Sequence, residues 1–321
     1  MCVIVERRQQ GLRSIMTADR RRTFEWPTVA LIAMVYAVLA SLVWFHASLP
    51  WWIITPAGAY CVALYASLQH EILHGHPTSN RLLNEAMQFP TLHFWLPFGR
   101  YKATHLTHHN DSNLTDPRLD PESYYLLPDD WAAMPGIKRT LYQFNNTLFG
   151  RMLIGPAISV IRFWSSEFRA ILGGNRETAR HWAWFALSAA LSVWFITGIA
   201  AMPLWQYLAF VAYPGVSLAL VRSYCEHQAA EHFEHRTIIV EASPFWSLLF
   251  LNNNLHVAHH TRPALAWYRI PAYYRAERTQ LLARNNGYTM NGYGEIFRRY
   301  FFSAKEQIPY PNMAWLKQDV D

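Results

Sequence analysis

The sequence predicts an all-α membrane protein with four transmembrane helices in two hairpins and a helical cytosolic cap that holds a histidine-rich site. Three observations lead to this prediction. Hydrophobic residues make up 52% of the 321 residues and charged residues only 16%, whereas soluble domains have about 25% charged residues. Lys and Arg are absent from residues 23–80 and from residues 181–221. Three groups of closely spaced histidines flank the apolar segments.

Two pairs of apolar segments lie inside these gaps in positive charge. The spans are expected near residues 26–47, 51–69, 181–201 and 204–221, and each is close to the ~20 residues that cross a bilayer. Tryptophans cluster at the first turn, as is typical of a membrane interface. Arginines flank each gap, so the positive-inside rule places both termini, including the basic segment 1–25, in the cytosol.

The remaining sequence favours a single membrane-embedded domain over residues 1–321. The segment 147–168 is apolar but contains two arginines and a glutamate, so it is expected at the membrane interface, with a further span as the alternative. The three cysteines form no C-x-x-C pair, which argues against a disulfide framework. A net charge of +6 without a basic, aromatic-rich face gives no support to nucleic-acid binding.

The histidine pattern points to metal binding. His70 and His74 are four residues apart, a spacing that puts both on one face of a helix. The spacing H-x-x-H-H then occurs twice, and one further histidine follows the last apolar segment. Imidazole binds Fe, Zn, Cu and Ni, and a single zinc takes four ligands, so this number of histidines predicts two metal ions. The histidines that could converge at such a site are His70, His74, His105, His108, His109, His227, His256, His259 and His260.

Other polar residues close to these histidines are candidates for orienting them, for balancing charge or for an extra ligand. Carboxylates commonly do this beside metal-bound imidazoles, although Asp-Pro steps such as those in "DPRLDPES" also simply favour turns. The candidates are Glu71, His76, Asp116, Asp120, Ser223, Glu226, His232 and Asn252. Isolated histidines such as His46, His93 and His181 are interpreted as core or surface residues.

The three histidine groups resemble the boxes of the integral-membrane fatty acid desaturase and hydroxylase superfamily, and the resemblance covers residues 26–275. It implies a di-iron centre on the cytosolic side of four transmembrane helices, with O2 as co-substrate and two external electrons. By position it implies the eight box histidines as ligands, with His227 as the ninth. Some acyl desaturases have an asparagine four residues before that histidine, where this chain has Ser223.

The resemblance implies a fatty acyl desaturase that introduces a C=C bond into a lipid drawn from the bilayer. Carotenoid or other lipid hydroxylases and ketolases are alternatives within the superfamily, and "TDPRLDPES" resembles the acidic stretch of carotenoid ketolases. A different class is also open, because "HEILH" fits the H-E-x-x-H pattern of zinc metalloproteases, with Glu71 as general base. The chain has no H-P-G-G, C-x-x-C or G-x-G-x-x-G motif, so a separate ferredoxin, rubredoxin or cytochrome b5 type donor is expected.

Overall fold

The computed structural model describes residues 24–109 and 111–320. Most of the basic segment 1–25 therefore lies outside the described residues. Among the described residues, four helical segments are long and apolar enough to cross a membrane. They are α2 (Trp26–Trp44), α3 (Trp51–Leu73), α9 with the π-helical η2 (Arg176–Val193, Trp194–Ile199), and α10, the π-helical η3 and α11 (Leu204–Tyr207, Leu208–Ala212, Tyr213–Ser223).

These bounds confirm the prediction of a mainly helical protein with four spans and correct some of its boundaries. Helix α3 continues to Leu73, four residues beyond the predicted end, so His70 lies in its last turn. The third span begins at Arg176 instead of 181, because the Asn175 side chain accepts a hydrogen bond from the Thr178 N–H and caps the helix there. A polar first turn of this kind is invisible to a search for apolar runs.

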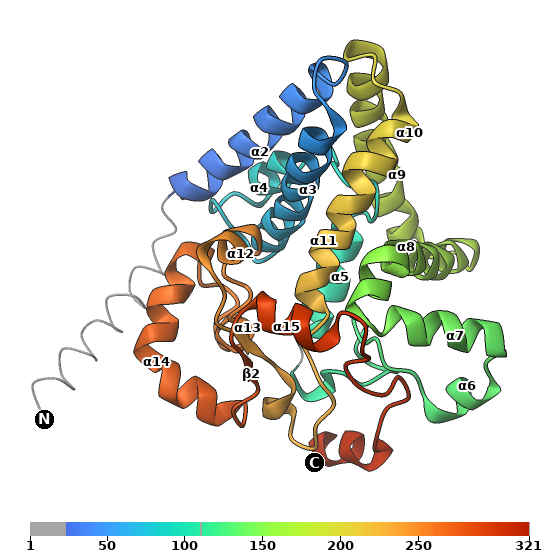
Figure 1. Cartoon of the computed structure of the whole chain (residues 1–321), viewed down its shortest axis with the longest axis vertical. Coiled ribbons are helices and arrows are strands. Elements are labelled where there is room, and N and C mark those ends of the chain that lie inside the picture. The colour runs from blue at the N-terminus through green and yellow to red at the C-terminus, as the bar shows by residue number, and fades with distance from the viewer. Residues whose placement is uncertain (1–23, 110, 321) are drawn as a thin grey trace, which may run out of the picture.

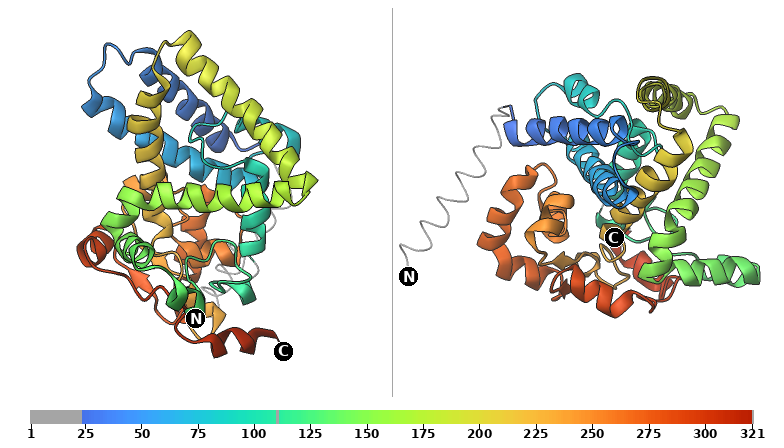
Figure 2. Two further views of the ribbon diagram at one scale, coloured as in Figure 1. Left: turned by 90° about the vertical axis from the view of Figure 1, so that its right-hand side faces the viewer. Right: turned by 45° about the horizontal axis from the view of Figure 1, so that its top comes forward.

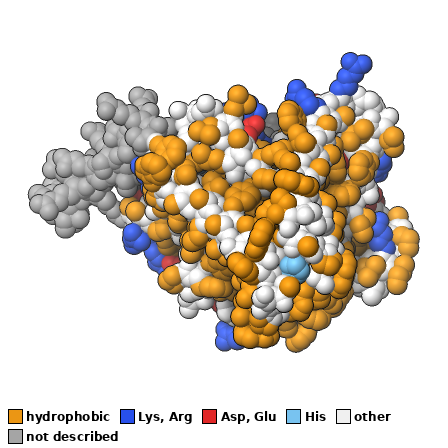
Figure 3. Space-filling model, turned by 90° about the horizontal axis from the view of Figure 1, so that it is seen from above, with side chains coloured by type: hydrophobic (Ala, Val, Ile, Leu, Met, Phe, Trp, Pro, Cys, Tyr) orange, Lys and Arg blue, Asp and Glu red, His pale blue; other side chains and the backbone are white. Residues whose placement is uncertain are grey.

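The four spans lie together at one end of the molecule, and most of the remaining elements gather at the other end (Figures 1 and 2). The turns from α2 to α3 and from η2 to α10 lie at the top of Figure 1. Viewed from above, hydrophobic side chains predominate on the surface, and Lys and Arg occupy its margins (Figure 3). Trp52, Trp184 and Trp194 are among the apolar side chains exposed on the spans, as expected for a surface that faces lipid.

Helices α3 and α11 pack closely at the centre of the spans because glycine lies at their crossing. A Cβ atom at Gly215 of α11 would lie 2.4 Å from Cβ of Val62 and 3.2 Å from the Ala59 carbonyl oxygen of α3. Small residues allow membrane helices to approach in this way. The crossing matters for the site because α3 ends at the first histidine group and α11 ends just before His227.

Replacing Gly215 with alanine is therefore expected to destabilise the protein by about 1–3 kcal/mol, the usual cost of overpacking a core. The measurement is thermal unfolding in detergent. Gly136→Ala is the matched control, because no atom lies within 4 Å of a Cβ at that position. Equal unfolding midpoints for the two variants would show that the α3–α11 packing accommodates the extra methyl group without loss of stability.

Outside the spans, the described residues form helices, 3₁₀ turns and one two-stranded sheet. The parallel strands β1 (Ile239–Val240) and β2 (Thr289–Met290) pair with Ile239 opposite Thr289, a detail that the all-α prediction lacked. The helices and 3₁₀ turns are α4 (Arg81–Met87), α5 (Phe98–His108), η1 (Asp111–Asn113), α6 (Pro128–Ala133), α7 (Gly136–Asn145), α8 (Leu148–Leu172), η4 (Phe233–Arg236), α12 (Pro244–Leu249), α13 (His256–Thr261), η5 (Trp267–Arg269), α14 (Ile270–Arg284), α15 (Tyr293–Tyr300) and η6 (Met313–Val320).

Helix α8 covers the segment for which an interfacial position or a further span was expected. It is not among the four candidate spans. Its first half packs on α11, where Ser217 Oγ donates to the Met152 carbonyl at 2.7 Å. Ile161 and Leu172 are exposed apolar residues of the same helix. The helix thus has one face on the spans and a second, uncovered face on which apolar side chains are mixed with arginines and serines.

Candidate metal centre

The structure brings the nine predicted histidines together in two groups. Within each group the ligand atoms all lie within 4.8 Å of one another. The five-histidine group consists of His70, His74, His105, His109 and His259, and the four-histidine group consists of His108, His227, His256 and His260.

Each H-x-x-H-H box contributes to both groups, in opposite proportions. At the end of α5, His105 and the C-cap residue His109 join the five-histidine group, while His108 joins the four-histidine group. In α13 the proportions are reversed, because the two residues four apart join the four-histidine group and His259 joins the other. The spacing of three and four residues therefore lets one short helix serve two metal positions.

The distances between imidazole nitrogens fit metal coordination. In the five-histidine group, His105 Nε2 lies 3.0 Å from Nε2 of both His70 and His109. In the other group, His227 Nε2 lies 3.1 Å from Nε2 of both His108 and His256. Two nitrogens bonded to one metal at about 2.1 Å and at right angles lie about 3.0 Å apart. The donor set therefore suits two borderline transition-metal ions.

Protonation also favours metal binding. Burial lowers the pKa of His109, His227 and His259, and the neighbouring imidazoles lower it further. These rings are thus neutral, the form that binds metals. In addition, Nε2 of His74 is buried without a hydrogen-bond partner, and a metal ion is a chemically reasonable partner for it. His108 is an exception, because its pKa is raised to about 9. Burial lowers this pKa, but the nearby carboxylates of Glu122, Asp120 and Glu226 raise it by more.

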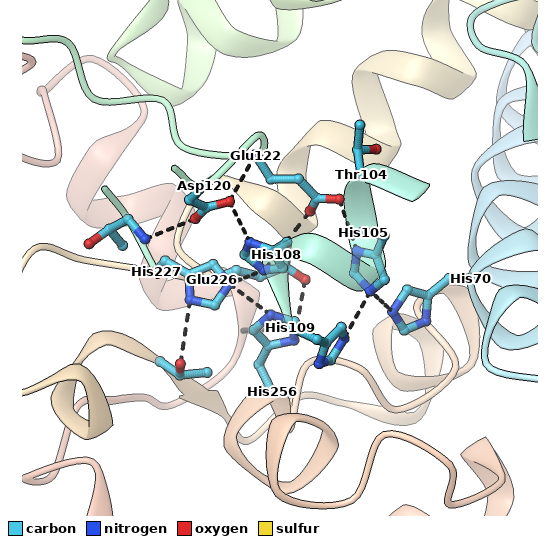
Figure 4. Close-up of polar contacts among 12 residues, drawn as sticks. His70, Thr104, His105, His108, His109, Asp120, Glu122, Glu226, His227 and His256 are labelled. Carbon is cyan, nitrogen blue, oxygen red and sulfur yellow. Dashed lines mark hydrogen bonds and ion pairs between the residues drawn. The ribbon is translucent and has the colours of Figure 1, made fainter. Parts of the chain in front are cut away.

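Hydrogen bonds at Nδ1 hold several of these rings with Nε2 facing inward (Figure 4). His108 Nδ1 donates to Asp120 Oδ1 at 2.9 Å, and Asp120 Oδ2 accepts from the Thr115 N–H at 2.8 Å. His256 Nδ1 donates to Asn253 Oδ1 at 2.9 Å. Such outer hydrogen bonds fix the tautomer and the direction of a ligating ring. Asp120 is thus the candidate from the acidic stretch that contacts a box histidine directly.

His227 comes from a loop, and its position depends on a buried arginine. Its Nδ1 donates to the Arg236 carbonyl at 3.3 Å. The Arg236 side chain, which is fully buried, donates to the carbonyls of Ala230, Glu231 and Leu114 at 2.9–3.1 Å. These bonds close the loop after α11 and attach it to the segment after the second histidine box.

Several other candidates lie near the centre but outside both groups. Glu71 Oε2 accepts from the Trp267 N–H at 3.3 Å, and His76 Nδ1 donates to Glu25 Oε1 at 2.7 Å. Glu226 forms an ion pair with Arg222 at 2.9 Å and lies 3.7 Å from His256 Nδ1. Glu226 is therefore placed to balance charge beside His256. Glu71 links α3 to Trp267, and His76 links the segment after α3 to Glu25.

The remaining candidates do not contact the histidine groups. Asp116 pairs with Arg118 at 2.8 Å and shapes a local turn. Ser223 Oγ donates to the Leu220 carbonyl at 3.3 Å, His232 is exposed, and Asn252 Nδ2 donates to the Trp267 carbonyl at 2.9 Å. The contacts of Asp116 and Ser223 are local ones, as expected of turns and helix ends, whereas Asn252 joins the turn before the third box to η5.

Two residues that bond to box histidines, Glu122 and Asn253, lie in runs that the sequence analysis considered but were not chosen individually. Arg222, which pairs with Glu226, was not considered. Glu122 Oε1 accepts from His105 Nδ1 at 2.9 Å, although only the aspartates of the same acidic stretch were singled out. Asn253 belongs to the "NNN" run, and its neighbour Asn252 was chosen instead. Helix and turn registers decide which member of such a run faces the ring, and no local sequence signal separates them.

The fold and the site define a membrane protein with two histidine clusters that could bind metal. The chain matches the sequence model of the fatty acid desaturase family over residues 48–292, and it therefore belongs to that family. No curated protein matched the chain. Membership confirms the resemblance and makes the protein an oxidoreductase of the membrane. The geometry gives no support to an H-E-x-x-H protease, because Glu71 bonds to Trp267 and His70 belongs to a five-histidine group.

Proposed function

We propose that this protein is an O2-dependent di-iron desaturase that introduces a C=C bond into the acyl chain of a membrane lipid. The main supporting observation is the pair of histidine groups at the ends of α3 and α11, next to the apolar layer formed by the spans. Histidine-rich sites with open positions suit iron. Two irons held there would supply the activation of oxygen needed to attack an unactivated C–H bond.

The protein's own residues would contribute position and environment. Asp120 and Asn253 orient His108 and His256 through Nδ1, which keeps their Nε2 lone pairs directed inward. His70, His105 and His259 are almost completely buried, so water has little access to these three rings. Spans that end at the centre would let an acyl chain approach it from the bilayer, and such alignment is a large part of catalysis.

The proposal includes the orientation in the membrane and the electron source. Arginines flank both apolar pairs, which supports a cytosolic position for the centre and both termini. A separate ferredoxin, rubredoxin or cytochrome b5 type protein would deliver the electrons there. Hydroxylation is the second candidate reaction.

The test combines metal content with lipid products. The protein would be expressed in a membrane host supplied with iron, purified in detergent and analysed for iron and zinc per chain, while the host lipids are extracted. Two irons and a new unsaturated acyl chain are expected. Both should be lost in the double variant His108→Ala, His109→Ala, which removes one ligand from each group.

Two other results have distinct meanings. Two irons together with a new alcohol would replace desaturation by hydroxylation at the same centre. One zinc and no iron would contradict the di-iron proposal itself.

A further inference from the structure

A segment near the C-terminal end of the chain, residues 304–310, lies against the loop that carries His227. It follows α15 and lies beyond the region that the chain shares with the family. Leu126 forms two backbone hydrogen bonds with the segment, at 2.9 and 3.1 Å, and the Lys305 N–H donates to the Asn146 carbonyl at 3.3 Å. These bonds fix the segment between the stretch after the second histidine box and the start of α8.

The Lys305 side chain is buried at this junction and ends at the backbone of His227. It is 6% exposed. The ammonium donates to the His227 carbonyl oxygen and to Tyr124 Oη at 2.7 Å, and it pairs with Glu306 Oε1 at 2.7 Å. A lysine ammonium has three N–H donors, so each donor has one acceptor within reach. Burying an ammonium is costly unless it is paired and hydrogen-bonded, and all the contacts that offset this cost lie beside His227.

Two neighbouring tyrosines extend the network to a second point of the same loop. Tyr124 and Tyr125 each donate to one carboxylate oxygen of Glu306. Tyr125 Oη also accepts from the Ala229 N–H at 2.6 Å. The loop is thus held at His227 and again two residues later, and both points are connected to the C-terminal segment.

His227 depends on such contacts more than the other eight histidines do. Those eight lie in α3, α5 and α13 or in the C-cap positions of α3 and α5, whereas His227 lies in a loop. Its Nδ1 donates to the Arg236 carbonyl at 3.3 Å, which is longer than most N–H···O hydrogen bonds. A ligand on a loop needs contacts from other parts of the chain to keep its Nε2 in place, and Lys305 provides one at the residue itself.

We propose that Lys305 is a positioning residue for His227 and that the segment 304–310 completes the four-histidine metal position. Lys305 acts through the backbone of His227, while Glu306 and the two tyrosines hold the ammonium in place. One metal position of this chain thus depends on a segment that contains no histidine motif. This inference rests on the proposed pair of irons.

The test is a double-mutant cycle on metal retention. Purified protein loaded with iron is exposed to increasing concentrations of a chelator, and the iron left per chain is counted. Lys305→Met keeps an unbranched side chain but removes the ammonium. We expect this variant to release one iron at a chelator concentration about 10-fold lower than the wild type, the usual effect of losing a group that supports a ligand. Lys138→Met, a change at an exposed lysine, should give the wild-type curve.

The second half of the cycle identifies which iron is affected. His227→Ala leaves the iron of the five-histidine group, and adding Lys305→Met to this variant should not change the release of that iron. If the double variant releases it as much earlier as Lys305→Met releases the first iron, Lys305 supports the fold in general and the inference is wrong. Wild-type release in Lys305→Met alone would also overturn it.

A second variant covers the case in which Lys305→Met fails to fold. Tyr125→Phe removes the bond to Ala229 and leaves every charge in place. It should weaken retention of the same iron, and unchanged release would overturn the inference. A wild-type protein that binds no iron would refute the proposed function itself, a result that differs from two bound irons that are insensitive to Lys305.

Discussion

Replacing His227 with alanine is expected to abolish activity and to remove one of two metal ions. His227 Nε2 lies 3.1 Å from the inward-facing nitrogens of both His108 and His256, so its loss opens the middle of the four-histidine group. Residues that merely orient ligands contribute 10–100-fold to affinity or activity, and a ligand itself should contribute at least about 100-fold. The five-histidine group contains no atom of His227 and should keep its metal.

The measurement is metal content per chain together with product formation. His232→Ala is the matched control, since this exposed histidine follows His227 by five residues and belongs to neither group. It should retain both metals and full activity. If His227→Ala kept two tightly bound metals, His227 would be a bystander and the four-histidine position would need a different ligand set.

Replacing Arg236 with methionine is expected to produce the largest loss of stability. The guanidinium is fully buried and donates to the carbonyls of Ala230, Glu231 and Leu114. Each buried acceptor left without a donor costs about 1–3 kcal/mol, so the total is about 3 kcal/mol or more. For a protein of this size that corresponds to a fall of roughly 5–10 °C in the unfolding midpoint.

The same change should loosen His227, because the Arg236 backbone carbonyl accepts the hydrogen bond of its Nδ1. Thermal unfolding in detergent and metal retention are the two measurements. Arg81→Met is the control, because Arg81 is a surface arginine paired with Glu85 on one helix, and pairs of this kind contribute little. A stable Arg236→Met variant that loses metal only from the four-histidine position would show that the arginine positions the loop without supporting the fold.

Much of the fold could be predicted from local sequence properties. Apolar length and the distribution of arginines identified the four spans, because the bilayer imposes both on any chain that crosses it. The errors fell at helix ends, such as the cap at Asn175. The two-residue strands at Ile239 and Thr289 carried no sequence signal, because a pair this short depends on contact between distant segments.

The site, like the fold, could be predicted only in part from the sequence. The sequence by itself determined which residue types are available: eight histidines at spacings of three and four and a ninth, His227, with acids and amides close by. Only the tertiary structure decided that His108 joins His227, 119 residues away, while its neighbour His109 joins His259. It also selected Glu122 and Asn253 over their neighbours. The physical reason is that imidazole chemistry and helical spacing are local properties, whereas the distance between two ligands depends on how α3, α5, α11 and α13 pack.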